Sequence, residues 1–312
     1  MGDMNEGQVS NDSATGSAPE TESTPSERTK SGSERRALAR YLGGGHSRIV
    51  VGATLTLAMV LMAVFAPYVA THDPLRTEVR NRLQPPSREN IMGTDEFGRD
   101  VFSRIVFGSQ VSMFVGVGVV FFSTVAGMAI GLLSGYYRRL DNVLMRVMDA
   151  LMAFPSILLA IAILAALGPR ITNVIVALSI VYTPRTARVV RGSVLSVREE
   201  AYVESARAIG LGDLRIIVRY VLPNVLAPLI VQATFILALT IIAEAGLSYI
   251  GAGTPPPTPS WGNILADGRP HIFRAQWMTT FPGLFIMVAV LGLNIVGDGL
   301  RDVLDPRQKG SQ

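Results

Sequence analysis

The chain has 312 residues, of which 49% are hydrophobic and 17% are charged, and its mean hydropathy is +0.36. This composition is typical of a membrane protein and excludes an ordinary soluble enzyme. The absence of cysteine excludes disulfides and thiolate metal sites, and the three histidines, His46, His72 and His271, are too scattered to predict a metal site. The formal net charge of +4 is small, so the distribution of charge is more informative than its size.

The two ends of the chain are predicted to be polar tails. Residues 1–40 begin with a stretch rich in Ser, Thr, Gly, Glu and Asp, which cannot bury enough apolar surface to fold. The start of the chain has neither the basic region nor the apolar core of a secretory signal, so we expect the first hydrophobic segment to be retained. A membrane domain is predicted over residues 41–307, followed by a short tail at 308–312.

Six segments are apolar enough to cross a bilayer, whose ~30 Å hydrocarbon layer requires about 20 residues of helix. They are predicted at about residues 49–69, 111–135, 143–167, 171–190, 221–243 and 281–296. The fourth crosses only if it continues past Pro184, with Arg185 and Arg188 reaching toward the headgroups. Six crossings place both termini on one side, and nineteen of the 28 Arg and Lys residues fall there. The positive-inside rule then predicts a multi-pass protein of the cell (plasma or inner) membrane, embedded in lipid, with both termini cytoplasmic.

The loop between the first two spans contains a cluster of turn-forming residues. Glycine and aspartate favour tight turns, and Asp100 lies where it could cap a helix that leads into the second span. We favour a structural role for this cluster, and direct contact with a solute or another protein is the alternative. Its members are Gly93, Thr94, Asp95, Gly98, Arg99 and Asp100.

The second span carries a glycine at every fourth position, at Gly127, Gly131 and Gly135. This spacing places the three glycines on one helical face, where a neighbouring helix can approach closely. We favour packing within the chain over a dimer interface.

The third span contains a candidate gate. Asp149 is the one acidic residue within the apolar centre of a span, and Arg146 precedes it by the three residues that permit an ion pair on a helix. Phe154 and Pro155 predict a kink, because proline removes a helical hydrogen bond. We favour a structural or gating role for Arg146, Asp149, Phe154 and Pro155 over a proton site at Asp149.

A charged hairpin of two helices is predicted over residues 196–223, between the fourth and fifth spans. In its first helix Tyr202, Ala206 and Ile209 follow an i, i+4, i+7 spacing and share one face, which we expect to contact a partner. Charged side chains such as Arg207 keep the other faces in water.

The turn and the second helix of the hairpin have their own signals. Gly210 is predicted to end the first helix, and Asp213 to cap the second. Pro223 is predicted to end the second helix. Four residues before it form an apolar stripe: Leu214, Ile217, Val218 and Val221.

The region after the fifth span is predicted to lie at the outer surface. Glu244 is expected to be a solvated or helix-end carboxylate. The prolines at 255–257 and 259 stiffen a loop that leads to Trp261 and Gly262, and Trp261 and Trp277 are predicted to anchor at the membrane interface.

The chain cannot hold ATP in a P-loop. Its only two lysines are Lys30 and Lys309, and neither lies in the G-x-x-x-x-G-K-[ST] pattern. Transport driven by this chain therefore requires another subunit that hydrolyses ATP, or an ion gradient.

The hairpin resembles the EAA loop in the membrane subunits of ATP-binding-cassette (ABC) importers, through Glu204, Ser205, Ala206, Gly210, Tyr220, Leu222 and Pro223. In that family the hairpin is the coupling helix that docks in a groove of the ATPase subunit. The resemblance implies an ATPase-coupling role for Tyr202, Glu204, Ala206, Arg207, Ile209, Gly210, Leu222 and Pro223. An amphipathic hairpin lying on the membrane surface is the alternative.

Three further stretches are similar to signatures of dipeptide, oligopeptide and nickel permeases. They are MGTDEFGRDVF at 92–102, PTPSWGNILADGR at 257–269 and GDGLRDVLDPR at 297–307. Together with the hairpin they resemble the "C"-type membrane subunit of such importers, which pairs with a different "B"-type subunit. The rigid outer loop around Trp261 and Gly262 could then also receive a solute-binding protein.

The resemblance implies an all-α polytopic membrane protein, the transmembrane domain of a type I ABC importer, with six transmembrane helices and a cytoplasmic EAA coupling hairpin. The implied function is a permease subunit that translocates a solute, most simply a di- or oligopeptide. The implied partners are a "B"-type permease subunit, two ATPase subunits that use ATP and Mg, and an extracytoplasmic binding protein. No cofactor bound by this chain, no metal and no nucleic acid is expected. The alternatives are an ion-coupled secondary carrier or channel acting alone, and a membrane scaffold or sensor.

Overall fold

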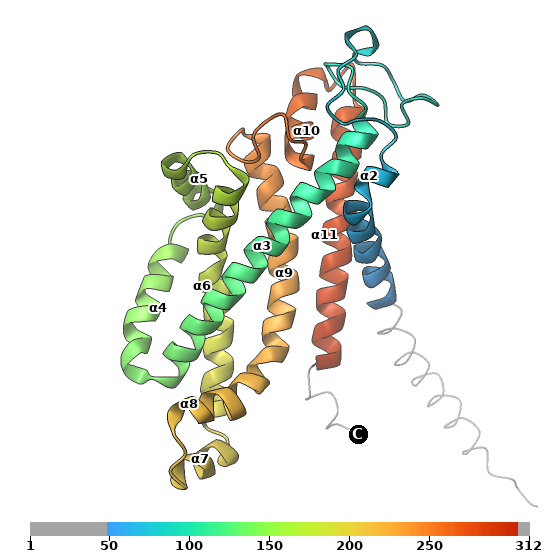
Figure 1. Ribbon diagram of the computed structural model, residues 1–312. Helices are drawn as coiled ribbons and strands as arrows, with labels where there is room; N and C mark the ends of the chain where they lie inside the picture. The colour runs from blue at the N-terminus through green and yellow to red at the C-terminus, as the bar shows by residue number, and fades with distance from the viewer. Residues whose placement is uncertain (1–48, 305–312) are drawn as a thin grey trace, which may run out of the picture. The chain divides into compact units, whose positions relative to one another are not determined.

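The computed structural model describes residues 49–304, and within this range the chain is helical with no β-strand (Figure 1). The predicted tails, residues 1–40 and 308–312, and the last residues of the signature at 297–307 lie outside the described residues. The elements are the helix Ile49–Val64, α2 (Ala66–Val69), η1 (Val79–Asn81), α3 (Val101–Tyr136), α4 (Arg138–Met152), α5 (Ser156–Leu167), α6 (Ile171–Arg198), α7 (Ala201–Ala208), α8 (Asp213–Ile216), η2 (Ile217–Val221), α9 (Leu222–Tyr249), α10 (Trp261–Gly268), η3 (Arg269–His271) and α11 (Trp277–Leu304).

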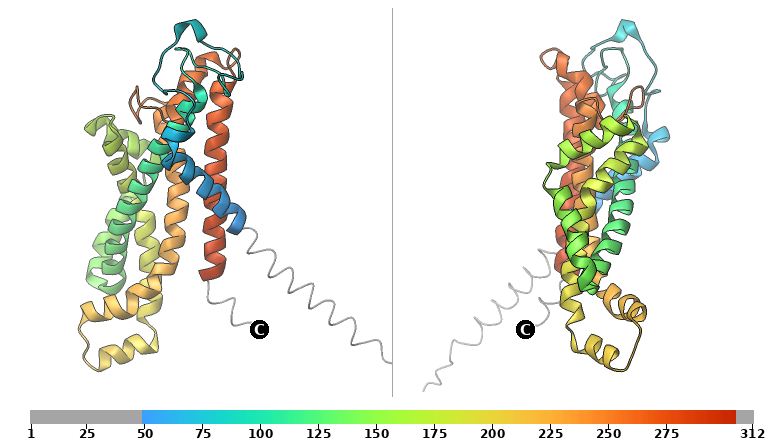
Figure 2. Two further views of the ribbon diagram at one scale, coloured as in Figure 1. Left: turned by 45° about the vertical axis from the view of Figure 1, so that its right-hand side comes forward. Right: turned by 90° about the vertical axis from the view of Figure 1, so that its left-hand side faces the viewer.

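Long helices form a bundle whose two ends differ. One end, here named the hairpin end, carries α7 and α8, and the opposite end, named the loop end, carries residues 70–100 and α10 (Figure 2). The helix Ile49–Val64 runs antiparallel to α11, because Gly52 contacts Ile295 whereas Gly292 contacts Leu55. The described chain therefore begins and ends toward the hairpin end (Figure 1).

The glycine repeat of α3 packs against α6. A Cβ atom placed on Gly131 would lie 2.5 Å from the Cβ of Val190. Gly127 and Gly135 meet Thr186 and Val194 in the same way, so α3 and α6 run in parallel with backbones in close approach. The repeat serves packing within the chain, as the sequence favoured.

Replacing Gly131 with valine should separate these two helices. The added branched side chain has no room against Val190, and overpacking of this kind costs about 1–3 kcal/mol. We expect a lower thermal unfolding midpoint for the purified protein, measured by fluorescence-detected size-exclusion chromatography. Gly192→Ala is the matched control, because no atom lies within 4 Å of a Cβ placed at this α6 position. Equal midpoints for the two variants would show that the close approach does not hold the bundle.

The predicted helix over 143–167 is not continuous, which corrects the third span. α4 and α5 are bent by 92° at the break between Met152 and Ser156. Pro155 has an extended backbone (ψ 129°), and its ring cannot continue the helix because it lacks an N–H and clashes with the preceding turn. The bend lies at the predicted position, but it breaks the helix into two separate helices, whereas a kink within one helix was predicted. Phe154 beside it is exposed.

Two ion pairs hold α4 on α6. Asp149 accepts a hydrogen bond from Arg188 at 2.5 Å, so the predicted pair with Arg146 is wrong. Arg146 forms no ion pair with any described residue. Asp141 accepts two bonds from Arg191, at 2.5 and 2.7 Å. The three-residue spacing on one helix permits a pair between Arg146 and Asp149. Arg188 on the neighbouring helix α6 takes the Asp149 carboxylate instead.

By length and composition, three helical stretches of the described chain can cross a membrane: α3, the stretch Asp213–Tyr249 formed by α8, η2 and α9, and α11. The bent pair α4–α5 would make a fourth if it is one span, and the helix Ile49–Val64 is shorter. The helices also extend past the predicted limits, since α6 continues through Pro184 to Arg198 and the 37-residue stretch Asp213–Tyr249 exceeds 221–243. The count of six crossings stays a prediction.

Candidate functional site

The first helix of the hairpin, α7, ends in a glycine-dependent turn. Gly210 has a φ of +81°, in the left-handed region that favours glycine. Its N–H donates to the carbonyl of Arg207, and the N–H of Leu211 donates to the carbonyl of Ala206. These two bonds define a Schellman motif, which satisfies the last carbonyls of the helix. Gly210 therefore ends α7 as the sequence predicted.

The second limb of the hairpin differs from the prediction in two respects. Gly212, rather than Asp213, occupies the N-cap position of α8, and no side chain caps it. Pro223 does not end a helix, because α8 passes through the π-helical turn η2 into α9, where Pro223 occupies the first turn. Pro223 therefore lies inside a continuous helical stretch, directly after the π-helical turn. Leu222, beside it, is half-buried.

The buried face of α7 also differs from the predicted one. Val203 and Ala206 pack inward against the second limb, with exposed fractions of 0% and 4%. Tyr202 and Ile209 point outward, at 43% and 77%. The predicted shared face therefore does not hold, because Ala206 belongs to the packed side.

Several apolar side chains of the hairpin have no partner within the described chain. Ile209 and Leu214 are about three-quarters exposed, and Val218 is more than half exposed. Exposed apolar side chains on a short charged hairpin indicate a surface that another protein or the membrane surface covers. We name Tyr202, Ile209, Leu214 and Val218 the exposed hairpin set.

Tyr202 is held in place within this set. It stacks on Tyr220 with ring centroids 6.4 Å apart and accepts a hydrogen bond from Asn224 at 3.2 Å. Partial burial, and then the charge of Glu200, raise the pKa of the Tyr202 phenol above its ordinary value.

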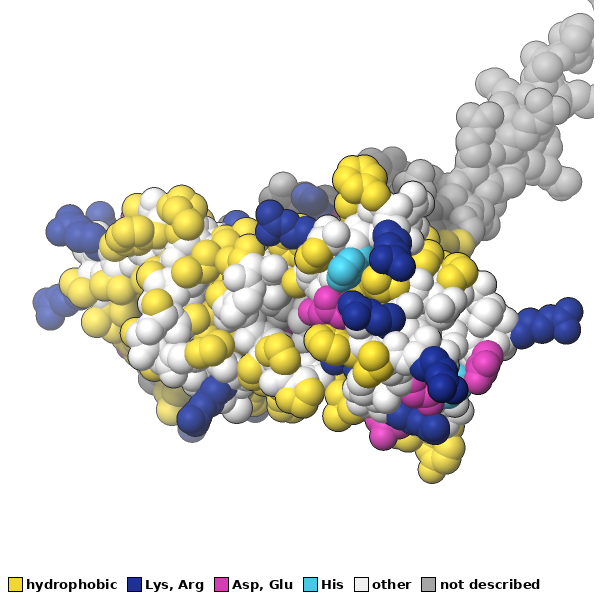
Figure 3. All heavy atoms as spheres, turned by 90° about the horizontal axis from the view of Figure 1, so that it is seen from above, with side chains coloured by type: hydrophobic (Ala, Val, Ile, Leu, Met, Phe, Trp, Pro, Cys, Tyr) yellow, Lys and Arg dark blue, Asp and Glu magenta, His cyan; other side chains and the backbone are white. Residues whose placement is uncertain are grey.

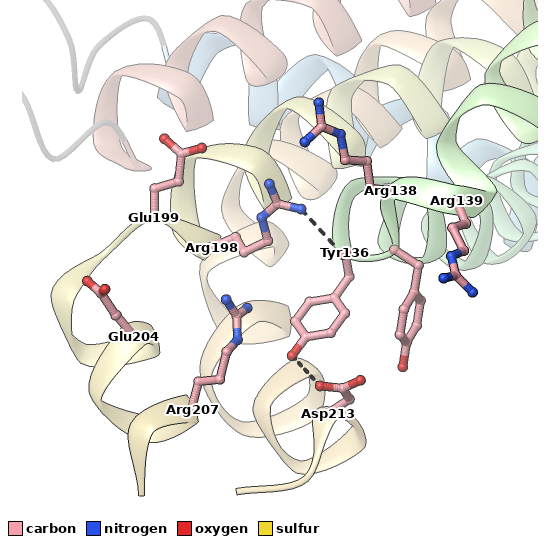
Figure 4. Close-up of a pocket in the computed structure, with 9 residues that line it drawn as sticks. Tyr136, Arg138, Arg139, Arg198, Glu199, Glu204, Arg207 and Asp213 are labelled. Atoms are coloured by element: carbon pink, nitrogen blue, oxygen red, sulfur yellow. Dashed lines mark hydrogen bonds between the residues drawn. The ribbon is translucent and has the colours of Figure 1, made fainter. Parts of the chain in front are cut away.

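A cavity of about 740 Å³ lies behind the hairpin, where the ends of α3 and α6 meet α7 and α8 (Figure 4). Its lining brings together four arginines, three acids and two tyrosines: Arg138, Arg139, Arg198, Arg207, Glu199, Glu204, Asp213, Tyr136 and Tyr137. The labelled side chains come from α3, α4, α6, α7 and α8 and from the residue that follows α6 (Figure 4). We name this the hairpin cavity.

Tyr136 is the link between the bundle and the hairpin. Its hydroxyl donates to Asp213 at 2.8 Å, and its backbone carbonyl accepts from Arg198 at 3.4 Å. The Arg207 guanidinium lies 5.8 Å from the centre of its ring. No ion pair joins the cavity's arginines to Glu199 or Glu204 among residues 49–304. Sequence patterns did not predict a role for Tyr136, because its hydrogen-bond partner Asp213 is 77 residues away.

The loop end is held by a buried charge network centred on Asp95. This fully buried carboxylate accepts hydrogen bonds from the Arg99 side chain at 2.6 Å and from Arg104 at 2.5 Å. It also accepts from the backbone N–H groups of Phe97 and Arg99. Arg104 reaches on to Asp267 of α10 at 2.9 Å. The network thus joins the loop, α3 and α10.

Asp100 caps α3, as predicted. Its carboxylate accepts from the backbone N–H of Ser103 at 2.8 Å and from the hydroxyls of Ser103 and Thr71. The Ser103 hydroxyl in turn accepts from the backbone N–H of His72. These hydrogen bonds hold Thr71 and His72, which follow α2, against the start of α3.

The remaining predicted loop residues are structural in this conformation. Trp261 is fully buried and donates its indole N–H to the Ile105 carbonyl at 3.0 Å, so it is not an interfacial anchor. Trp277 donates to the carbonyl of Thr94 at 3.0 Å, and its indole packs on Gly93. Gly262 packs on the α9 backbone at Ala245.

The predicted contact residues of the loop end are mostly buried, so other side chains form the surface of this end. Gly93, Thr94, Asp95, Gly98 and Asp100 are buried and Arg99 is nearly so, which leaves them little surface for a binding protein. Ile91, Phe97 and Phe273 are exposed instead, with Phe273 at 96%. Figure 3 shows this end, where charged and apolar side chains are interspersed.

Glu244 is buried, which corrects the expectation of a solvated carboxylate. Its side chain has an exposed fraction of 0% and accepts hydrogen bonds from the hydroxyls of Ser248, Thr254 and Ser112, at 2.7, 3.1 and 3.2 Å. The helix continues past it to Tyr249, so position 244 lies inside the bundle. Within the described range, no group of three or more His, Asp or Glu side chains could hold a metal ion.

Comparison with known proteins identifies relatives over most of the chain. The family described as "Binding-protein-dependent transport system inner membrane component" matches residues 123–310, and "N-terminal TM domain of oligopeptide transport permease C" matches residues 46–86. A provisionally named peptide transport system permease protein of Brucella abortus is 53% identical over 264 residues, covering 85% of this chain and 89% of the relative. The dipeptide transport system permease protein DppC of Alkalihalophilus pseudofirmus is 46% identical, covering 83% and 86%.

A solved structure shares the fold. A chain of the MetNI methionine ABC transporter in an inward-facing conformation aligns with a TM-score of 0.56 at 19% identity, covering 65% of this chain and 96% of that one. At this identity the likeness concerns the fold alone, which is that of an ABC importer transmembrane domain.

Proposed function

Because the chain belongs to the family of binding-protein-dependent transport system inner membrane components, which are permeases of ATP-driven importers, we propose that it carries di- or oligopeptides handed over by a binding protein. The cargo is inferred from relatives at 46–53% identity whose names specify peptide or dipeptide transport. The chain is a permease component and not a catalytic subunit. ATP and Mg are used by its partners.

The hairpin is the single observation that carries the mechanism. Its exposed set offers a surface for a protein partner, and the family context favours an ATPase subunit as that partner over the membrane surface. The proposed assembly has this chain, a "B"-type permease, two ATPase subunits and an extracytoplasmic binding protein. The hairpin end then faces the cytoplasm, together with both termini.

The hairpin cavity supplies the route by which movement of the ATPase reaches the bundle. When the ATPase subunits close on ATP, they displace α7 and, through the packing of Val203 and Ala206, the second limb of the hairpin. The Tyr136–Asp213 and Arg198–Tyr136 hydrogen bonds transfer this displacement from α8 to the ends of α3 and α6. A partner shifts such an equilibrium only by binding its two conformations unequally. The permease pair therefore alternates between inward-facing and outward-facing forms as the ATPase changes state.

The orientation can be tested directly because the chain has no cysteine. A single cysteine at Arg207 should react with an impermeant maleimide only from the cytoplasmic side, and one at Phe273 only from the outer side. Vesicles containing the complete transporter should take up peptide with ATP and binding protein, and should take up none without the ATPase subunits. Labelling of position 207 from outside, or uptake driven by an ion gradient in the absence of the ATPase, would overturn the proposed function.

A further inference from the structure

The loop end exposes more arginines than acids. Residues 70–100 and the connection between α10 and α11 form one surface, because Nε2 of His271 lies 3.1 Å from a carboxylate oxygen of Glu96. The Trp277 indole also donates to the Thr94 carbonyl. Five exposed arginines of this surface form no ion pair within the part of the chain that the structure describes: Arg80, Arg82, Arg88, Arg269 and Arg274.

Most acids of the same surface are engaged inside the fold. Five of them are buried or ion-paired: Glu78, Asp95, Glu96, Asp100 and Asp267. Asp73 and Glu89 are exposed and form no ion pair with a described residue. The exposed part of the loop end is therefore cationic, and its guanidinium groups are available to an acidic partner.

Exposed apolar side chains lie among these arginines. Phe273 has an exposed fraction of 96% and Val79 of 67%, and Ile91, Phe97 and Ile272 are also exposed. Figure 3 shows apolar and arginine side chains side by side on this end. Arginine and aromatic residues are enriched in protein–protein interfaces, where lysine is depleted, and this surface contains no lysine. Its composition therefore matches a surface that binds protein.

The location of the arginines also favours a protein over lipid phosphates. A bilayer surrounds the sides of a helical bundle, whereas residues 70–100 and α10 lie at its end (Figures 1 and 2). With the hairpin end in the cytoplasm, the loop end faces outward, where membrane proteins usually carry fewer arginines and lysines than on the cytoplasmic side. Arginines that run against this tendency are explained by a partner that approaches from outside.

We propose that the loop end captures the solute-binding protein through an acidic face of that protein. The proposal rests on the orientation and the binding-protein partner of the proposed function. Arg80, Arg82 and Arg88 donate to carboxylates of the binding protein, since the guanidinium fork matches carboxylate geometry. Phe273 adds an apolar contact. Opposite charges on the two surfaces speed the encounter and fix the orientation of the docked protein, and dissolved salt weakens this attraction.

The test measures the affinity of the purified binding protein for the complete transporter in nanodiscs of neutral lipid. Binding is compared at about 10 and about 100 mM salt, over which the Debye length falls from about 30 to about 10 Å. The wild type should bind more weakly at the higher salt concentration. For the triple variant Arg80→Gln, Arg82→Gln, Arg88→Gln we expect a dissociation constant about tenfold higher at low salt, because each exposed contact contributes a few-fold. Its affinity should also depend less on salt.

Three further variants separate charge, geometry and position. The corresponding triple lysine variant keeps the charges without the forks, so it should keep the salt dependence with an intermediate affinity. Phe273→Ala should weaken binding by the same factor at both salt concentrations. Arg301→Gln is the control, because it removes an exposed arginine at the hairpin end that forms no ion pair with a described residue. It should leave the affinity and its salt dependence unchanged.

The proposal is overturned if the triple glutamine variant binds as tightly as the wild type, or if salt does not change the affinity of the wild type. It is also overturned if the wild type captures no binding protein at either salt concentration. In vesicles, the triple variant should reach wild-type ATP-dependent uptake once the binding protein is saturating, and a loss that persists at saturation would assign these arginines to the fold instead. A wild type that captures the binding protein but takes up no peptide would refute the proposed cargo and support the docking surface.

Discussion

Replacing Asp95 with alanine should destabilise the protein more than any other single substitution at the loop end. The change leaves the buried Arg104 and the nearly buried Arg99 with Asp267 as their remaining carboxylate partner, and it removes the acceptor of two backbone N–H groups. Removing one partner of a buried ion pair typically costs about 3–5 kcal/mol, because the remaining charge is uncompensated. We expect a marked drop in the thermal unfolding midpoint and in the yield of monodisperse protein.

Two comparisons make the Asp95 result specific. Arg76→Gln disrupts an ion pair with Glu78 whose arginine is 68% exposed, and it should change stability by less than about 1 kcal/mol. The double variant Asp95→Ala, Arg104→Ala should lose less than the sum of its single variants, since the second change removes a buried cation whose main counter-charge the first change removed. Additive losses would mean that the two side chains do not act as one network.

Replacing Gly210 with proline should uncouple transport from ATP hydrolysis. Proline fixes φ near −65°, whereas Gly210 has a φ of +81°, and proline lacks the N–H that bonds to the Arg207 carbonyl. The Schellman turn cannot form, so α7 loses its fixed position relative to the second limb. We expect ATP-dependent uptake to fall by roughly 5–150-fold, the range that coupling free energies of 1–3 kcal/mol span. The protein should still insert into the membrane.

Gly212→Ala is the control for this turn. Gly212 has a φ of −67°, and no atom lies within 4 Å of a Cβ placed on it, so alanine fits without strain. Its uptake should equal that of the wild type.

Glu204→Arg tests the hairpin by a change of charge. It adds a fifth guanidinium to the hairpin cavity beside Arg207, and the variant should also lose ATP-dependent uptake. Normal uptake with both Gly210→Pro and Glu204→Arg would refute coupling through the hairpin.

The sequence identified features that depend on local chemistry. Gly210 ends α7 and Asp100 caps α3, because a left-handed turn and an N-cap are set by the residue and its near neighbours. The fold class was also predicted, since apolar runs and the motif resemblance both act over short stretches of chain. The glycine repeat on α3 predicted a close helix contact but not its partner, α6.

Features that depend on distant residues were missed or wrong. The hydroxyls of Ser112 and Thr254 that bury Glu244 come from other elements, and Arg188, which takes Asp149, is 39 residues away. The face of α7 was misassigned because Val203 and Tyr202 are adjacent, so apolar periodicity in a helix of eight residues does not decide which of them is packed. Packing against the second limb of the hairpin determines that Val203, and not Tyr202, is buried.

The continuity of α8, η2 and α9 has a mechanical consequence. These elements form one rod from Asp213 to Tyr249, which spans about 55 Å at 1.5 Å per residue. One extremity touches Tyr136, and Glu244 near the other is bonded to Ser112 and Thr254. A rod held along its middle by α6 and α11 pivots, so a push on one extremity would swing the opposite one in reverse. The π-helical turn η2 and Pro228 inside α9 are places where such leverage could be absorbed by bending.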